Sequence, residues 1–375
     1  MNIINRNYTK TLYHHSAVLK KLLVFYATNY YSSYPKAIVI ELSNRCNLKC
    51  RMCWFHGENG IGDRYRGAEI ETAEVLRFFK EMAPYKPKIY LGGSEPFIRD
   101  DFMLLLEYLK SHNFPVSFAT NGTLLDAAKI KKLTEIGVDD IKFSIDGNQE
   151  IHDYIRGKGV FKKVTQAVKE MAFYKNSMAS KKPIITINIT ITNEVYGRLK
   201  PTIAAIRKAV ADSADCYRLH HLWYVTENEL FEHQSAIHKA LGCKAAEAKA
   251  HLINLASTFN PKELANEIAD IRRGRGVSFF PNLQYSDIIN YYSEGLAVKA
   301  RCSAPFSGAV IKPNGDVKFC PDAWIDDYVI GNIRQERFMD IWNNKKARRF
   351  RKIIMKQKQF AGCKRCSWMY SFNLF

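Results

Sequence analysis

Short apolar runs alternate, from residue 37 to about residue 223, with segments whose apolar residues recur every three or four positions. The runs predict strands and the periodic segments predict helices, because a buried strand is apolar throughout whereas a surface helix buries one face. The expected strands are residues 37–42, 88–91, 115–119, 140–144, 184–190 and 217–223. Strands that alternate with helices predict an α/β fold, with a parallel sheet and right-handed crossovers.

The pattern changes after residue 225. Residues 226–275 are rich in Ala, Glu and Lys without a clear strand, and residues 277–280 are again strand-like. A hairpin is expected between Cys302 and Cys320, since Pro313 to Asp316 has the composition of a turn. We therefore expect an N-terminal helical extension (1–36), a core (37–225), a helical insertion with a connecting strand (226–294) and a small C-terminal domain (295–375).

The formal net charge is +19, from 56 Lys and Arg against 37 Asp and Glu. A basic chain can attract nucleic acid or anionic lipid. In the basic run 345–352, however, Phe350 and the following Ile353 and Ile354 recur at helical spacing, so the charges are expected on the outer face of an amphipathic helix. With no RNA-binding module in the sequence, nucleic acid is not the favoured partner.

The cysteines and the N-terminal segment indicate the cellular compartment in which the protein is expected. The apolar stretch 18–26 is too short and too charged to cross a bilayer, and we expect no transmembrane segment. No secretory signal is recognised, and the chain has 9 cysteines. Thiols of a reducing compartment serve metals or catalysis rather than disulfides, so a cytoplasmic protein is expected.

Three cysteines, Cys46, Cys50 and Cys53, form a C-x₃-C-x₂-C run directly after the first expected strand. Three thiolates can hold three irons of a cubic iron–sulfur cluster, whereas such clusters normally have four cysteine ligands. The fourth iron would then be open to another ligand. A structural zinc site is the alternative, but zinc usually takes four protein ligands.

The run resembles the signature of the radical S-adenosylmethionine (SAM) enzymes, and further segments extend the resemblance. They are Gly92-Gly93-Ser94-Glu95-Pro96, Thr120-Asn121-Gly122, Ser144-Ile145-Asp146-Gly147 and His152-Asp153-Tyr154-Ile155-Arg156-Gly157. The resemblance implies a partial (β/α)6 parallel barrel. It also implies a [4Fe–4S] cluster whose open iron binds SAM, reductive cleavage of SAM, and a 5′-deoxyadenosyl radical that takes hydrogen from a substrate.

The same resemblance implies which residues contact SAM. The Gly92–Pro96 segment corresponds to the family's G-G-E-P motif for the amino group, with Ser94 in place of the second glycine. Ser144 and Arg156 would contact the carboxylate, and a guanidinium suits that group. The expected cofactor-binding residues are Gly92, Gly93, Ser94, Glu95, Asn121, Ser144, Asp146 and Arg156.

A second group, Cys302, Cys320, Cys363 and Cys366, lies near the C-terminus. It resembles the auxiliary domains of the family, of which the larger (SPASM) carries two extra clusters and the shorter (twitch) carries one. Four cysteines imply one fully ligated auxiliary [4Fe–4S] cluster. A zinc site with four cysteines remains the alternative, because spacing alone does not separate the two.

The catalytic residues are not identified by the sequence, and four candidates remain. Cys216 and Cys243 are outside both groups, and each is either a hydrogen-atom donor or a small buried residue. His220 and His221 are neighbours on one expected strand and therefore lie on opposite faces. One of them could reach substrate as an acid–base group, and packing is the alternative for both.

Three substrate classes fit a radical SAM enzyme of this kind. We rank first a small polar molecule, such as a sugar or aminocyclitol, that is oxidised or epimerised. A peptide or protein ranks second, because only 45 residues precede Cys46 and a peptide-recognition module needs about twice that number. RNA ranks third, and a non-catalytic metal-binding scaffold is the alternative of another class. The resemblance also implies an electron donor such as flavodoxin or ferredoxin.

Overall fold

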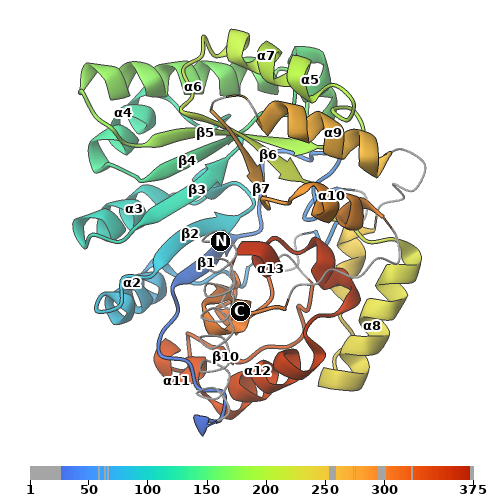
Figure 1. Ribbon diagram of the computed structural model, residues 1–375. Coiled ribbons are helices and arrows are strands. Elements are labelled where there is room, and N and C mark those ends of the chain that lie inside the picture. Colours follow the sequence, from blue (N-terminus) through green and yellow to red (C-terminus); the bar gives the residue numbers. More distant parts are fainter. Residues whose placement is uncertain are drawn as a thin grey trace, which may run out of the picture.

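A ten-stranded sheet with the order β10-β9-β8-β1-β2-β3-β4-β5-β6-β7 forms the centre of the molecule in the computed structural model (Figure 1). The structure describes residues 27–57, 60–62, 65, 67–252, 259–272, 274, 276–293, 301–321 and 324–371. The strands are β1 Ala37–Ser43, β2 Lys88–Gly93, β3 Val116–Thr120, β4 Asp140–Ser144, β5 Ile184–Ile191, β6 Cys216–His221, β7 Val277–Phe280, β8 Gly308–Ile311, β9 Asp316–Lys318 and β10 Gly331–Asn332.

Strands β1 to β7 pair in parallel in chain order, which confirms the predicted α/β fold. Strands β1 to β6 bury apolar residues, such as Ile38, Leu91 and Ile187, because helices cover the outer face of the sheet. The sheet curves as a partial barrel, and β7 and β10 are its two edges, so it does not close. The carboxyl ends of the parallel strands therefore face one shared side, where α/β folds place their ligands.

The helices between the core strands bury one apolar stripe each, as the periodicity predicts. Helix α4 ends at Gly137, whose left-handed φ of 72° is the usual way to stop a helix. The α-helices of the core are α2 Thr72–Met82, α3 Phe102–Ser111, α4 Ala127–Ile136, α5 Gln149–Arg156, α6 Val160–Ser177 and α7 Leu199–Ala209.

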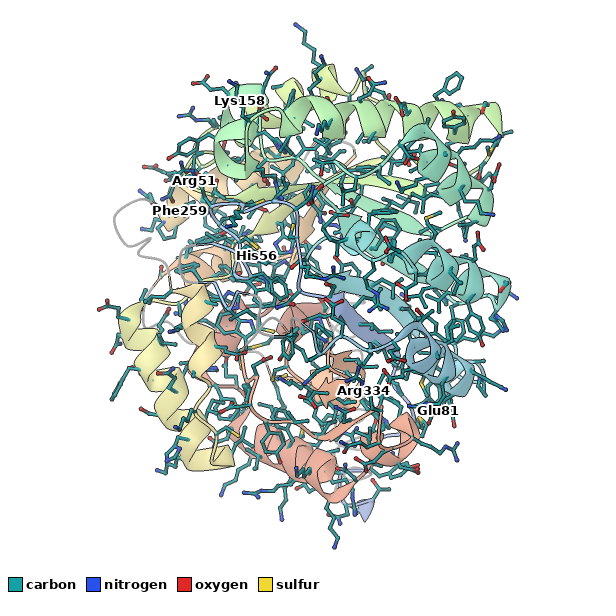
Figure 2. All side chains as sticks on the ribbon, turned by 180° about the vertical axis from the view of Figure 1, so that it is seen from behind. Arg51, His56, Glu81, Lys158, Phe259 and Arg334 are labelled. Carbon is teal, nitrogen blue, oxygen red and sulfur yellow. The ribbon has the colours of Figure 1, made fainter. Side chains whose placement is uncertain are left out.

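The C-terminal region extends the main sheet. Strand β8 pairs in parallel with β1, with Ala37 opposite Gly308, and β9 returns antiparallel to complete the expected hairpin. Helix α2 contacts the same region, because Glu81 accepts hydrogen bonds from the backbone N–H groups of Phe338 and Met339, both at 3.0 Å. Figure 2 shows Glu81 near Arg334 at this contact.

Among the described positions of residues 226–293, the regular structure is helical apart from β7. Helix α8 (Glu227–Leu241) packs on the C-terminal region, and a short 3-10 helix η2 (Ala246–His251) follows it. In the sequence, helix α9 (Pro261–Arg272) precedes β7 and helix α10 (Tyr285–Tyr292) follows it. The C-terminal helices are α11 Phe338–Trp342, α12 Lys345–Gln357 and α13 Ser367–Ser371, and the remaining 3-10 helices are η1 Pro96–Ile98, η3 Ala304–Phe306 and η4 Ala361–Arg365.

One expected surface charge is buried. Helix α12 buries Phe350 and Ile354, as its periodicity predicts, but Arg351 is also 0% exposed. Its guanidinium donates to the Pro305 carbonyl at 2.8 Å and to Asn343 Oδ1 at 2.8 Å, so buried acceptors replace water. The expected N-terminal helix at residues 18–26 lies outside the described residues. No helix in the described part of the chain is long and apolar enough to cross a membrane.

Candidate functional site

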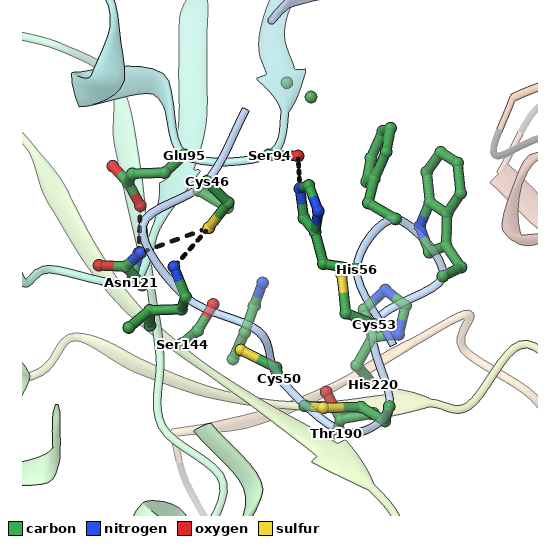
Figure 3. Close-up of a pocket in the computed structure, with 18 of the residues that line it drawn as sticks. Cys46, Cys50, Cys53, His56, Ser94, Glu95, Asn121, Ser144, Thr190 and His220 are labelled. Atoms are coloured by element: carbon green, nitrogen blue, oxygen red, sulfur yellow. Dashed lines mark hydrogen bonds between the residues drawn. The ribbon is translucent and has the colours of Figure 1, made fainter. Parts of the chain in front are cut away.

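A cavity of about 320 Å³ opens where the parallel strands end (Figure 3). Two groups of residues line it. The charged half, as we call it, contains the predicted cluster and SAM residues: Cys46, Cys50, Cys53, Gly92, Gly93, Ser94, Glu95, Asn121, Ser144 and Arg156. The aromatic half contains Trp54, Phe55, His56, His220, Leu222, Trp223, Ala250 and His251. Of the eight predicted SAM-binding residues, only Asp146 does not line the cavity.

The loop after β1 brings Cys46, Cys50 and Cys53 to the cavity. Backbone hydrogen bonds fold it tightly, with Cys53 N–H donating to the Cys50 carbonyl at 3.0 Å. Burial raises the pKa of the Cys46 thiol to about 12 and also raises the pKa of Cys50, although Arg156 opposes the latter shift. Thiols of this kind ionise when iron binds, since a bound cation deprotonates them.

The donor set fits an iron–sulfur cluster. Three soft sulfur ligands converge on one cavity, and the Arg156 Nη1 lies 3.7 Å from Cys50 Sγ, where its charge can stabilise a thiolate. No described group of three His, Cys, Asp or Glu residues converges closely enough to surround a single ion. Each thiolate of a cubic cluster binds a different iron, so cluster ligands need not converge on one point.

The turn after β2 has a geometry that only glycine permits. Gly93 has φ of +104°, and a Cβ atom there would lie 2.1 Å from the Ser43 carbonyl oxygen. The turn therefore passes directly against the end of β1, where the cysteine loop begins. Ser94 replaces the family's glycine, and its hydroxyl donates to the Asn44 carbonyl at 2.9 Å and lies 3.1 Å from His56 Nε2. The serine thus adds a tie between the turn and the cysteine loop.

Glu95 is 2% exposed and faces the same cavity. Its carboxylate accepts hydrogen bonds from Thr120 Oγ1 at 2.9 Å and from the backbone N–H of Asn121 at 2.8 Å. Burial raises the pKa of Glu95 to about 7, and these hydrogen bonds limit the shift. A buried carboxylate with this pKa becomes fully ionised when a cation binds beside it.

Arg156 is held by a buried carboxylate. Its Nε donates to Asp146 Oδ2 at 2.5 Å, and Asp146 Oδ1 accepts from the Thr190 backbone N–H at 2.8 Å. Burial opposes the charge of Arg156, but Asp146 outweighs it and raises the pKa of the guanidinium. Asp146 therefore positions Arg156 from behind the cavity wall, and it is not placed to contact a ligand in the cavity.

The four other candidates fall in different places. His220 and His221 both line the cavity; His221 also packs against the tyrosines of α10, with Nδ1 2.9 Å from the Tyr292 hydroxyl. Cys216 lies at the opposite end of β6, with Sγ 3.1 Å from Ser278 Oγ, and Cys243 follows α8 near Asp327. Neither cysteine lines the cavity.

The second cysteine group is gathered by three segments. Cys302 precedes η3, Cys320 follows β9, and Cys363 and Cys366 are on and after η4. Burial raises the pKa of Cys302 to about 12 and that of Cys363 to about 11. Burial and then the charges of Cys363, Cys302 and Cys366 raise the pKa of Cys320. The charges of these thiols therefore act on one another, although they do not converge on a single ion; a cubic cluster, in which each thiolate binds a different iron, does not require that.

Sequence reasoning missed the residues that support this second group. Glu229 and His233, one turn apart on α8, contact the loop of Cys363: Glu229 pairs with Lys364 and Arg365, and His233 Nδ1 accepts from the Gly362 N–H at 3.1 Å. It also missed the aromatic half. The alternation of elements does not reveal these contacts, although Trp54, next to Cys53, was a visible signal.

Known proteins share both parts of the chain. Residues 40–178 match the Radical SAM superfamily, and residues 302–367 match SPASM, an iron–sulfur cluster-binding domain; together they cover more than half of the chain. A cofactor-modifying protein for the tungsten-containing aldehyde ferredoxin oxidoreductase of Pyrococcus furiosus is 24% identical over 349 residues, 88% of this chain and 87% of its own.

Two further relatives have other names. Pre-heme d1 synthase of Dinoroseobacter shibae is 24% identical over 321 residues, 82% of this chain and 73% of its own. Mycofactocin maturase MftC of Mycobacterium tuberculosis is 26% identical over 313 residues, 83% of this chain and 71% of its own.

A solved structure has the same fold. Streptococcus suis SuiB bound to precursor peptide SuiA matches with a TM-score of 0.59 at 15% identity, over 96% of this chain and 75% of SuiB. A core of this family binds a [4Fe–4S] cluster with SAM, and a SPASM domain binds auxiliary iron–sulfur clusters. The chain therefore belongs to the radical SAM superfamily and carries a C-terminal SPASM domain.

Proposed function

We propose that this radical SAM enzyme modifies a peptide. The observation that carries the proposal is the aromatic half of the cavity, where Trp54, Phe55, Leu222 and Trp223 offer apolar and aromatic surface. A sugar or aminocyclitol needs several polar partners, whereas a peptide side chain needs mainly such surface. The relatives support this choice, since SuiB is bound to a precursor peptide and one relative is a maturase. The small polar substrate expected from the sequence has no such support.

The charged half has the groups that SAM requires. We propose that Cys46, Cys50 and Cys53 hold three irons of the [4Fe–4S] cluster, that Arg156 and Ser144 bind the SAM carboxylate, and that Glu95 with the Gly92–Gly93 turn binds its ammonium. The ammonium lowers the pKa of Glu95 and so keeps it ionised. The chemistry supplied there is reductive cleavage of SAM to a 5′-deoxyadenosyl radical that takes hydrogen from the substrate.

We propose that Cys302, Cys320, Cys363 and Cys366 hold one auxiliary [4Fe–4S] cluster. Changing Cys363 to Ala should then remove about four irons per chain while SAM cleavage persists. Loss of zinc with unchanged iron would instead identify a zinc site with four cysteines. An electron donor such as flavodoxin or ferredoxin is part of the proposal, and it should replace dithionite in SAM cleavage.

The test of the function is anaerobic reconstitution followed by SAM and dithionite. We expect 5′-deoxyadenosine from the wild type and none from the Cys46, Cys50 or Cys53 alanine variants. A library of synthetic peptides should stimulate 5′-deoxyadenosine formation and yield products with altered mass. If sugars or aminocyclitols stimulate it and peptides do not, the peptide proposal is wrong and the small-molecule interpretation returns. A properly loaded chain that forms no 5′-deoxyadenosine would be a scaffold.

A further inference from the structure

The aromatic half of the cavity is built from rings that meet edge to face. Trp223 packs against His220 with ring centroids 5.0 Å apart at 67°, and against His251 at 6.5 Å and 75°. Trp54 lies 5.7 Å from His251. These separations are those of favourable aromatic pairs, and a further ring placed among them would meet both faces and edges.

Surrounding residues fix these rings in place. His251 is 2% exposed and stacks on Trp324 at 4.4 Å and 16°. Its carbonyl accepts a hydrogen bond from the Val225 N–H at 2.8 Å, which ties η2 to the end of β6. Phe280 of β7 packs on the His220 ring with centroids 5.0 Å apart. The aromatic half is therefore formed before a ligand binds.

The hydrogen bonding of His220 fixes where its proton lies. Nδ1 is 3.0 Å from the carbonyl oxygen of His221, and because a carbonyl only accepts, Nδ1 carries the hydrogen. In a neutral ring the lone pair is then on Nε2, and Nε2 has no hydrogen-bond partner among the described residues. Figure 3 shows the ring at the cavity near Cys53.

The ring is neutral at physiological pH. Burial lowers the pKa of His220 to about 4, and the positive charge of Arg218 on the same strand adds to the shift. The His221 carbonyl and the more distant Asp146 oppose it. His220 therefore presents a hydrogen-bond acceptor, and not a cation, to the cavity.

We propose that the aromatic half binds a tyrosine side chain of the peptide substrate, whose hydroxyl donates a hydrogen bond to Nε2 of His220. This inference rests on the proposed function, since it names the side chain that would lie beside SAM. The rings of Trp54, Trp223 and His251 supply the aromatic surroundings, and His220 supplies the hydrogen-bond acceptor. A pocket that pairs with a hydroxyl rejects the analogue that lacks it, so phenylalanine should bind less tightly.

The adenine of SAM is the alternative ligand of the aromatic half, because it is also a planar ring with N–H donors. The two sources are separated by keeping SAM bound during the measurement. If His220 served adenine, its loss would weaken SAM binding, and the cavity would show no preference for a phenol.

The experiment uses the anaerobically reconstituted holoenzyme with saturating SAM and no reductant. Tryptophan fluorescence follows titration with three probes, the N-acetyl amides of tyrosine, phenylalanine and leucine. We expect the tyrosine probe to bind at least about tenfold more tightly than the phenylalanine probe, the factor for one net hydrogen bond, and the leucine probe to bind least. Equal binding of all three, or no saturable binding of the tyrosine probe, would overturn the inference.

The variant His220→Phe keeps a ring and removes the acceptor. It should bind the tyrosine and phenylalanine probes equally, with SAM affinity unchanged, whereas the control His112→Phe, an exposed position at the end of α3, should keep the tenfold preference. Weaker SAM binding by His220→Phe would assign the acceptor to adenine and overturn the inference. Should the variant not fold, the probe preference of the wild type decides alone.

The two proposals fail in different ways. If the wild type cleaves SAM but ignores the tyrosine probe, the tyrosine inference is wrong and the peptide proposal stands. If the loaded wild type forms no 5′-deoxyadenosine, the proposed function itself is wrong, whatever the probes show.

Discussion

Arg156 lies where the charged half of the cavity meets the cysteine loop, and its two ends have different partners. Nε is bonded to Asp146, and Nη1 is 3.7 Å from Cys50 Sγ. Because Nε is already bonded to Asp146, only the remaining N–H groups can bind a ligand, and the planar shape of the guanidinium matters as much as its charge. Arg156 and Asp146 do not form a simple surface ion pair, since the Arg156 side chain is only 11% exposed.

The change Arg156→Lys should therefore keep the charge and lose the binding geometry. A lysine can pair with Asp146 or with a SAM carboxylate, but not with both in the same positions. We expect unchanged iron content and SAM affinity weakened about tenfold or more, the cost of one charged hydrogen bond. Calorimetric titration of the reconstituted, unreduced protein with SAM measures this. Wild-type affinity in the variant would show that Arg156 does not contact SAM.

Seven of the eight SAM candidates, which the family resemblance implies, line the cavity, because they lie at or after the carboxyl ends of β2, β3 and β4 or, for Arg156, at the end of α5. Asp146 was grouped with them on its place in the motif, and only the three-dimensional structure shows it behind Arg156. Sequence alone also left His220 and His221 equivalent. Both line the cavity, and they differ in the neighbours contributed by β7 and α10, which lie 60 to 70 residues away: Phe280 packs on His220, and Tyr292 lies beside His221.

At the scale of elements, the turn after β2 depends on one glycine and tolerates change at its neighbour. A Cβ on Gly93 would meet backbone at 2.1 Å, whereas on Gly92 the nearest atom, at 3.0 Å, belongs to the Tyr90 side chain. A side chain can rotate away, and the backbone of β1 cannot.

The matched pair Gly93→Ala and Gly92→Ala tests this difference. We expect Gly93→Ala to lower the free energy of unfolding by about 3 kcal/mol or more, since it combines a left-handed φ with a backbone clash. Gly92→Ala should cost about 1 kcal/mol or less. Urea unfolding under anaerobic conditions gives both values. Similar costs for the two changes would contradict the close approach of the turn to β1.

Helix α8 supports the second cysteine group through a buried carboxylate. Glu229 is 4% exposed and pairs with both Lys364 and Arg365, which lie between Cys363 and Cys366. Arg365 also lies over the Tyr224 ring at 3.9 Å. Both cations pair with this carboxylate, and Lys364 Nζ also donates to the Ser293 carbonyl at 3.0 Å. Because both cations are buried, little water can compensate the loss of the carboxylate.

The change Glu229→Gln should therefore loosen this loop. We expect the auxiliary cluster to load poorly, with up to about four irons fewer per chain, while the cluster of Cys46, Cys50 and Cys53 still loads and cleaves SAM. Glu227→Gln, an exposed position on the same helix, is the control and should keep full iron content. Iron analysis and the electron paramagnetic resonance spectrum of the reduced protein distinguish the two clusters. Full iron in Glu229→Gln would show that the loop does not need α8.

The core strands and helices could be predicted from local periodicity, because each buries its own apolar pattern. The pairing of β8 with β1 could not be predicted, since it joins residues about 270 positions apart and the sequence of neither strand indicates its partner. The role of α8 was hidden for the same reason. Its apolar stripe predicts a helix, but Glu229 and His233 acquire meaning only from the loop packed against them.

On the scale of the whole molecule, a buried group of charges lies where the core sheet meets the SPASM region. Lys312 follows β8 and is 1% exposed, and its Nζ lies 2.6 Å from Glu41 Oε2 of β1 and 3.5 Å from Asp326 Oδ1. Asp326 also pairs with Lys318 at 3.1 Å. Burial opposes the charge of Lys312, but Glu41 and Asp326 outweigh it and raise its pKa.

These ion pairs join the two cofactor regions. Glu41 lines the cavity, and Asp326 lies six residues after Cys320. Tyr65, beyond the cysteine loop, donates to Asp326 Oδ2 at 3.0 Å, so three separate segments meet at Lys312 and Asp326. Such a group adds little net stability, because desolvation costs offset the attraction, but it penalises any arrangement in which a partner is missing.

The change Lys312→Met should therefore lower the free energy of unfolding much more than the removal of both Lys312 and Glu41. Alone, it leaves Glu41 buried without its cation, and we expect the free energy of unfolding to fall by about 3–5 kcal/mol. In Lys312→Met/Glu41→Met the unpaired charge is gone and Asp326 keeps Lys318, so most of that loss should be recovered. Urea unfolding of both variants and of Glu41→Met completes the double-mutant cycle. If the double variant is as unstable as the sum of the single ones, the two residues do not form a coupled pair.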